Sequence, residues 1–162
     1  MINTEIYIGL GSNIGDKLMN LKQSLEEINK FAFCEKVSSP YLSSPIGFSS
    51  QPSFINAVCK VSTELDCWRF LGRLNSIEKF IGRLRPFKNA PRRIDLDILL
   101  WGTLCITQPG LVVPHPEIEK RRFVLDPLIE VTPSIVNPVT GILFSENYSE
   151  SSGETDLIRI TW

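Results

Sequence analysis

Two segments of the chain alternate apolar and polar residues with a period of two, Glu5–Leu10 and Phe54–Thr63. Successive side chains of a strand point to opposite faces, so each segment is expected to form a strand with one buried face. In the second segment the buried face would consist of Ile55, Ala57, Cys59 and Val61. The opposite face would carry Phe54, Asn56 and Val58.

Two other segments repeat apolar residues every three or four positions, which is the period of a helix. The first helix is expected from about Lys17 to Lys30, after a turn at Gly11–Gly15 and with Asp16 as its N-terminal cap. Its apolar stripe consists of Leu18, Leu21, Leu25 and Ile28. The second helix is expected to begin after the cap Asp66, and its stripe consists of Phe70, Leu71, Leu74, Ile77 and Ile81.

Two further strands are predicted, over Phe31–Tyr41 and Ile94–Trp101, and a loop with two prolines, Ser43–Pro52, follows the former. The order strand, helix, strand, strand, helix, strand is that of the split βαβ, or ferredoxin-like, arrangement. We therefore expect an α+β sandwich, in which both helices cover one face of an antiparallel sheet. The opposite face would be left free, and the active site is expected there.

Asp95 and Asp97 interrupt the apolar run of the last predicted strand, Ile94–Trp101. Their spacing places both carboxylates on one face, where they would repel each other without a cation. Mg²⁺ is usually held by one or two carboxylates together with substrate phosphates, so the pair is typical of a magnesium site. The alternative is an exposed strand whose charges oppose aggregation.

Basic residues are concentrated in two short segments, although the formal net charge is only -1. Eight of them, and the single acid Glu78, lie between Arg69 and Arg93, and three more form Lys120–Arg122. A solvated helix face explains equally well the basic residues that lie on the predicted second helix. It does not explain those in or beside the proline-containing loop, namely Arg83, Arg85 and Arg92. This distribution favours a small anionic ligand over nucleic acid, which would favour a strongly basic domain.

The length of 162 residues predicts one domain, and 43% hydrophobic with 22% charged residues is ordinary for a globular protein. We expect no signal peptide and no membrane span, hence a cytoplasmic protein. The four cysteines lack the spacing of a zinc site and are expected to be reduced. Residues from about 145 to 162 read as a polar extension that ends in a short apolar stretch, Leu157–Ile160, a candidate edge strand.

Three residues each have two interpretations. Glu78 lies beside the apolar stripe of its helix, either paired with an arginine or in contact with a ligand at the edge of the sheet. His115, between two prolines, is either structural or directed at a ligand of the following basic cluster. Phe123 either begins an apolar core segment or stacks on a planar ligand.

Four motifs stand out along the chain, namely Gly9–Asp16, Ser44–Gly47 with Gln51–Asn56, Pro91–Leu99, and Val113–Pro116 followed by Arg121–Leu128. Together they resemble the 6-hydroxymethyl-7,8-dihydropterin pyrophosphokinase family. The resemblance runs from about residue 5 to residue 130, with the motifs in the family's order and spacing.

The resemblance implies transfer of pyrophosphate from ATP to the hydroxyl of a reduced pterin, with release of AMP, in folate biosynthesis. It implies that two Mg²⁺ ions bind Asp95 and Asp97, and that Arg83 and Arg92 act as catalytic clamps on the transferred group. The implied pterin-binding residues are Ser43, Ser44, Ile46, Phe54, Asn56 and Phe123. The implied ATP-binding residues are Asn75, Glu78, Arg85, Arg92, Ile98, His115 and Arg121. The partners would be these two small molecules, bound by a monomeric single pyrophosphokinase domain over residues 1–162.

The chain departs from the family pattern at three places. Phe54 stands where a tyrosine is common, Lys88–Ala90 replaces a stretch that holds a tryptophan in some members, and Gln108–Gly110 lacks a basic residue. Two rivals from other classes remain open. A nucleotidyltransferase would place its Gly-Ser turn close to its two aspartates, and a ferredoxin-like regulatory module would bind a metabolite without needing two carboxylates beside a basic loop.

Overall fold

The computed structural model describes residues 4–44, 50–82, 90–146 and 157–162. Its main sheet is antiparallel, with the strand order β5-β1-β4-β3-β8 and with β2 also paired to β4. The strands are β1 Thr4–Ser12, β2 Phe33–Val37, β3 Tyr41–Ser43, β4 Phe54–Thr63, β5 Asp95–Trp101 and β8 Ile158–Arg159. The predicted α+β ferredoxin-like class is confirmed.

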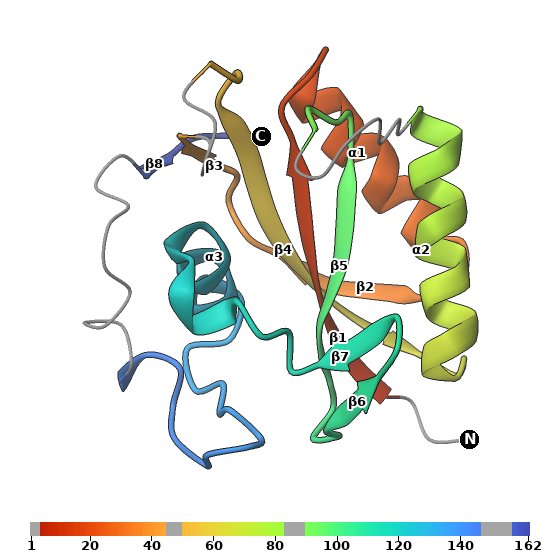
Figure 1. Cartoon of the computed structure of the whole chain (residues 1–162), viewed down its shortest axis with the longest axis vertical. Coiled ribbons are helices and arrows are strands. Elements are labelled where there is room, and N and C mark those ends of the chain that lie inside the picture. The colour runs from red at the N-terminus through yellow and green to blue at the C-terminus, as the bar shows by residue number, and fades with distance from the viewer. Residues whose placement is uncertain (1–3, 45–49, 83–89, 147–156) are drawn as a thin grey trace.

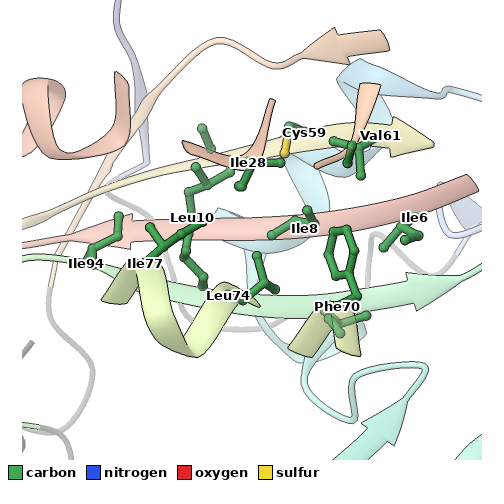
Figure 2. Close-up of a cluster of buried hydrophobic side chains, with 14 of the residues drawn as sticks. Ile6, Ile8, Leu10, Ile28, Cys59, Val61, Phe70, Leu74, Ile77 and Ile94 are labelled. Carbon is green, nitrogen blue, oxygen red and sulfur yellow. The ribbon is translucent and has the colours of Figure 1, made fainter. Parts of the chain in front are cut away.

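Helices α1 (Lys17–Ile28) and α2 (Cys67–Ile81) lie together on one face of this sheet (Figure 1). Both begin at the predicted caps, because Asp16 accepts a hydrogen bond from the Met19 amide and Asp66 accepts from two amides of its first turn. The main core lies between these helices and the aliphatic strand faces. Figure 2 shows part of it, with Phe70, Leu74 and Ile77 of α2 beside Ile6, Ile8 and Leu10 of β1.

The opposite face was expected to be free, but the structure shows that it is partly covered. Helix α3 (Arg122–Val131) packs there against β4, and a second core cluster forms beneath it (Figure 1). Tyr7, Val58 and Leu100 of the sheet meet Leu125 and Leu128 of α3 in this cluster. The uncovered part of the face is therefore limited to the end of the sheet beside the α3 N-terminus.

The strand predicted over Phe31–Tyr41 is two strands, which pair with different halves of β4. β2 pairs with the second half, Val37 opposite Cys59, and β3 with the first half, Ser43 opposite Phe54. Pro40 lies between them and has no amide to donate to a ladder. The break places β3 next to the strand end that carries Phe54 and Asn56.

A bulge in β5 anchors the chain that follows it. Ile8 is opposite Ile98 and Tyr7 is opposite Leu100, so Leu99 has no partner on β1. The carbonyl of Leu99 instead accepts a hydrogen bond from the His115 amide at 2.8 Å. The bulge thereby fixes His115 against β5, after the hairpin of β6 (Ile106–Gln108) and β7 (Leu111–Val113) and before the 3₁₀ turn η1 (Ile118–Lys120).

Other expectations concern the cysteines, the membrane and the end of the chain. All four cysteines are free, and Cys59 is fully buried. Within the described ranges no helix is long and apolar enough to span a bilayer. The predicted edge strand near the C-terminus is confirmed as β8, which pairs with β3.

Candidate active site

A pocket opens where the ends of β1, β4 and β5 face the N-terminus of α3. Its empty volume is about 880 Å³, a figure that includes open solvent at its mouth. Residues from all three strands, from β3 and from α3 line it. They include Gly9, Gly11, Ser43, Ser44, Gln51, Phe54, Asn56, Arg92, Asp95, Asp97, Leu99, His115, Arg121 and Phe123.

Asp95 and Asp97 both line the pocket, as their period-two spacing predicts. Leu96 between them is buried against the helices. Asp95 Oδ2 lies 2.8 Å from Arg92 Nη2, and both side chains are mostly buried. A carboxylate pair on one wall is a hard oxygen donor set, which fits Mg²⁺ completed by phosphate and water oxygens. In the part of the chain that the structure describes, no group of three or more His, Cys, Asp or Glu residues is arranged for a metal ion.

Arg92 lies over an aromatic ring as well as beside Asp95. Its guanidinium carbon is 5.1 Å from the centroid of the Phe54 ring, a cation–π distance. Nη1 donates to the Ala90 carbonyl at 3.3 Å, and the buried Nε has no hydrogen-bond partner among the described residues. An arginine with an unsatisfied donor in a pocket is suited to an additional anionic ligand.

The β3 and β4 wall carries a short polar chain. The Asn56 amide donates from Nδ2 to Ser43 Oγ at 2.8 Å, and Asn56 is 6% exposed. A side chain at Gly11 would meet Asn56 Oδ1 at 3.0 Å from its Cβ, so glycine there gives the amide its room. Phe54 stands beside this amide on the same face of β4.

Another wall is the beginning of α3. Phe123 lies in the first turn of the helix and lines the pocket, as does Arg121, which precedes the helix. The Arg121 guanidinium carbon lies 5.8 Å from the centroid of the Phe123 ring. Each of the two aromatic rings of the pocket, Phe54 and Phe123, is therefore accompanied by an arginine.

His115 is held in one orientation by the backbone around it. Its Nδ1 accepts a hydrogen bond from the Glu117 amide at 3.2 Å, so a neutral ring carries its proton on Nε2. Burial, followed by the positive charge of Arg121, lowers the pKa of His115 below its ordinary value. The side chain is thus suited to donate to an anion from Nε2 as a neutral imidazole.

Three of the predicted ATP-binding residues lie outside the lining of this pocket. Ile98 is buried in the main core, and Asn75 is exposed on α2. Glu78 is 5% exposed, and its Oε1 accepts a hydrogen bond from the Leu96 amide at 2.8 Å. These residues gather at α2 and β5, the edge strand of the sheet, so their predicted role requires ATP to extend beyond β5.

Three other predicted residues, Ile46, Arg83 and Arg85, lie outside the described residues. Asn13, which sequence reasoning missed, connects Gln51 with Arg92, two described residues that follow these segments in the chain. Asn13 is fully buried; its Oδ1 accepts from the Arg92 amide at 2.8 Å, and its Nδ2 donates to Gln51 Oε1 at 3.1 Å. The sequence signal was its place in the Gly-Ser-Asn turn, where a side chain can bond neighbouring backbone.

Comparison with protein-family models gives a match over residues 7–133. The matching model is that of 7,8-dihydro-6-hydroxymethylpterin-pyrophosphokinase. This range contains every described residue of the pocket lining.

Several relatives carry names from folate synthesis. A 2-amino-4-hydroxy-6-hydroxymethyldihydropteridine pyrophosphokinase of Aquifex aeolicus is 40% identical over 134 residues, which are 83% of this chain and 84% of the relative. The enzyme of the same name from Bacillus subtilis is 38% identical over 141 residues, 86% of this chain and 84% of the relative. The folic acid synthesis protein fol1 of Pneumocystis carinii is 39% identical over 91% of this chain, which spans only 20% of that longer protein.

The fold also matches solved structures. A crystal structure of Plasmodium falciparum HPPK-DHPS with pteroate superposes with a TM-score of 0.77 at 12% sequence identity. The match covers 98% of this chain and 47% of that one, so the chain corresponds to about half of it. At this identity the likeness shows the fold alone.

Proposed function

The chain belongs to the 7,8-dihydro-6-hydroxymethylpterin-pyrophosphokinase family, and we propose how its pocket carries out the reaction of that family. The activity is transfer of pyrophosphate from ATP to hydroxymethyldihydropterin in folate biosynthesis. The pterin hydroxyl oxygen forms a bond to the β-phosphorus of ATP, the bond from that phosphorus to the α,β-bridging oxygen breaks, and AMP leaves. The hydroxyl proton is lost to the surrounding water.

The pterin is proposed to lie between the rings of Phe54 and Phe123, on opposite walls of the pocket. Offset stacking of a planar ligand on each ring adds about 0.5–1.5 kcal/mol beyond the burial of surface. Asn56 would present its amide to the edge of the pterin, fixed by its hydrogen bond to Ser43. Ser43, Ser44 and Ile46 would complete the recognition of the ring.

The ATP phosphates are proposed to lie between the β5 carboxylates and the basic residues. Asp95 and Asp97 would hold two Mg²⁺ ions, which would supply positive charge to the phosphates when bound. His115 would donate from Nε2 to a phosphate oxygen, and Arg121 would add its positive charge. Asn75, Glu78 and the backbone of Ile98 would contact the nucleoside at the open edge of β5, with Arg85 on the phosphate side.

The chain's own contribution to rate is proposed to be position and charge, without a covalent nucleophile. Arg92 would move from Asp95 to the transferred group, and Arg83 would act on the same group from the other end of its segment. Removing one such contact costs about 2.7–4 kcal/mol of transition-state stabilisation. The pocket walls that carry the two rings would hold the pterin hydroxyl in line with the β-phosphorus.

The observation that carries this proposal is that a carboxylate pair and two aromatic side chains line one pocket together with three hydrogen-bond donors, Arg92, Arg121 and His115. A nucleotidyltransferase would release pyrophosphate instead of AMP. A binding module would release neither. AMP formation that requires the pterin separates the three activities.

The test is AMP release from ATP and Mg²⁺, with and without 6-hydroxymethyl-7,8-dihydropterin. We expect pterin-dependent AMP from the wild type and a loss of at least about 100-fold in Asp97→Asn, because one metal ligand is removed. Glu26→Gln, the same chemical change on the exposed side of α1, serves as control and should keep full activity. AMP release that does not require pterin, or an unimpaired Asp97→Asn, would contradict the proposal.

We also propose that residues 1–162 form one pyrophosphokinase domain, with 145–162 as its polar extension, and that the enzyme is a cytoplasmic monomer. The observation that supports a single domain is that β1 and β8 belong to one sheet. Sedimentation at the mass of a dimer would argue against the monomer.

A further inference from the structure

Residues 157–162, here called the C-terminal clip, are attached to the outer edge of β3. Arg159 is paired with Tyr41 and Ile158 with Leu42, in antiparallel register. The Ile160 amide donates to the Pro40 carbonyl at 2.9 Å. β3 has only three residues, so without the clip it would be a short edge strand paired to β4 alone.

One carboxylate joins the clip to β3 and to α3. Glu130, in the last turns of α3, accepts from Tyr41 Oη at 2.6 Å, from the Ser39 amide at 2.9 Å and from Ser39 Oγ at 2.9 Å. Arg159 Nη2 lies 3.1 Å from Glu130 Oε1, and Arg159 Nε donates to Ser39 Oγ at 2.8 Å. The result is a network in which β3, α3 and the clip share one acceptor.

The far end of the clip reaches the turn that precedes β3. Trp162 Nε1 donates to the Ser38 carbonyl at 2.9 Å. Ser38 is itself fixed to β4, because its Oγ accepts from the Val58 amide at 2.9 Å and its amide donates to the Val58 carbonyl. The clip is therefore held at both ends by groups that also hold β3 in place.

The two structures joined by this network both contribute to the proposed pterin pocket, β3 together with its partner β4 and α3 through its first turn. β3 carries Ser43, which accepts from Asn56, and the beginning of α3 carries Phe123. Glu130 connects the other end of β3 to the other end of α3. The Mg²⁺ carboxylates stand on β5, with β1 and β4 between that strand and β3.

We propose that the C-terminal clip positions the pterin pocket, by holding β3 and α3 at the separation that a planar ligand between Phe54 and Phe123 requires. Arg159 and Trp162 are then positioning residues that touch no substrate. The matching family model ends at residue 133 and does not contain the clip. This inference rests on the proposed pterin site, and it deepens it by assigning a function to a segment outside the shared motifs.

If the clip only stabilised the fold, its removal would lower the folded fraction of the protein. The apparent affinities for both substrates would then fall together. A positioning clip affects the pterin more than the nucleotide, because the proposed Mg²⁺ carboxylates on β5 are separated from β3 by β1 and β4. Residues that act without touching a ligand change its affinity by about 2- to 30-fold. The ratio of the two effects is the quantity that distinguishes the two roles.

The experiment compares the full chain with a variant lacking residues 157–162 and with Arg159→Ala. The dissociation constant of 6-hydroxymethyl-7,8-dihydropterin is measured with Mg²⁺ and a non-hydrolysable ATP analogue present, and that of the analogue is measured without pterin. Lys30→Ala, which removes an exposed ion pair with Glu27 on α1, is the control. Asn56→Ala reports on the pterin site itself.

We expect the pterin dissociation constant to rise about tenfold without the clip and about threefold in Arg159→Ala, with the analogue's constant changed less than twofold. Equal weakening of both ligands, or no weakening of either in a folded variant, would overturn the inference. If deletion of the clip prevents folding, Arg159→Ala decides. If the wild type binds no pterin, or if Asn56→Ala binds it as tightly as the wild type, the proposed function fails. If Asn56→Ala binds pterin more weakly but the clip variants bind it normally, only the inference about the clip fails.

Discussion

At the scale of single residues, Arg92 occupies positions that the proposed ligands require. Its guanidinium is paired with Asp95 at 2.8 Å and lies over the Phe54 ring at 5.1 Å. A metal ion would compete with it for the carboxylate, and a stacked pterin would compete with it for the ring. The arginine therefore compensates the charge of Asp95, and under the proposed function the substrates would displace it.

We predict that Arg92→Ala binds Mn²⁺, as a substitute for Mg²⁺, more tightly than the wild type when no nucleotide is present. Removing the competing cation should strengthen binding by about fivefold, the value of a partly exposed ion pair. Turnover should nevertheless fall by about 100-fold, because a clamp on the transferred group is lost. Mn²⁺ titration followed by electron paramagnetic resonance measures the first effect.

Arg93→Ala is the matched control, since Arg93 is the exposed neighbour of the same type. It should change neither Mn²⁺ affinity nor turnover by more than about twofold. Weaker Mn²⁺ binding in Arg92→Ala would mean that the arginine supports the metal site instead of competing with it.

The sequence predicted some residues of the pocket well and others not at all. Period-two alternation placed Asp95 with Asp97 because a one-residue shift would have buried both carboxylates. It gave no sign of Asn13, whose role depends on two segments that meet only in the folded chain. Local periodicity predicts which face of a strand or helix a side chain occupies. It does not predict hydrogen bonds between loops that are far apart in the sequence.

At the scale of elements, β5, the strand of Asp95 and Asp97, is supported from α2. β5 is the edge strand of the sheet, and its Leu96 amide donates to Glu78 Oε1 at 2.8 Å. Leu96 lies between the two aspartates, so this bond acts on the segment that sets their positions. A buried glutamate thus supplies a partner for backbone at an open strand edge.

We predict that Glu78→Leu destabilises the protein by about 1–3 kcal/mol, because the Leu96 amide loses its acceptor in a buried position. Glu78→Gln keeps an acceptor oxygen and should lose less than half as much. Denaturant unfolding measures the free energy of each variant, and Mn²⁺ titration shows whether the aspartates have moved. Equal losses in the two variants would exclude the hydrogen bond as the cause.

Elements differ in how well their sequence predicts them. Helices α1 and α2 follow clear apolar stripes and are capped by Asp16 and Asp66, so both were expected. Helix α3 was missed because Pro127 stands in its interior, where proline removes a helical hydrogen bond. Its apolar residues pack in a second core cluster, which forms only when the sheet is assembled.

At the scale of the whole molecule, Glu130 connects α3, β3 and β8 across one side of the sheet. Burial, the largest single effect, raises the pKa of Glu130, but the hydrogen bonds from Tyr41 and Ser39 and the charge of Arg159 together lower the pKa below its ordinary value. A carboxylate whose pKa is lower in the folded state stabilises the fold above its unfolded pKa. That stabilisation is lost as the pH falls through the folded pKa.

We predict that Glu130→Gln lowers the free energy of unfolding at neutral pH by about 1.5 kcal/mol, the value of a hydrogen bond to a charged group. The difference from the wild type should shrink as the pH is lowered below the ordinary glutamate range, because the wild-type carboxylate is then protonated. Urea unfolding at a series of pH values measures the difference. Glu26→Gln on α1 should give a pH profile parallel to that of the wild type, and a constant difference in Glu130→Gln would contradict the linkage.

The pairing of β8 with β3 also means that one edge of the sheet is completed by residues that are translated after all its other strands. β1, β4 and β5 precede residue 102, so the centre of the sheet with both aspartates is translated early. Chains generally begin to fold from their N-terminal part while translation continues. β3 and α3 are joined through the clip only when the ribosome has added residues 157–162. If the clip has the proposed positioning role, a nascent chain would be able to bind metal and nucleotide before it gains full affinity for the pterin.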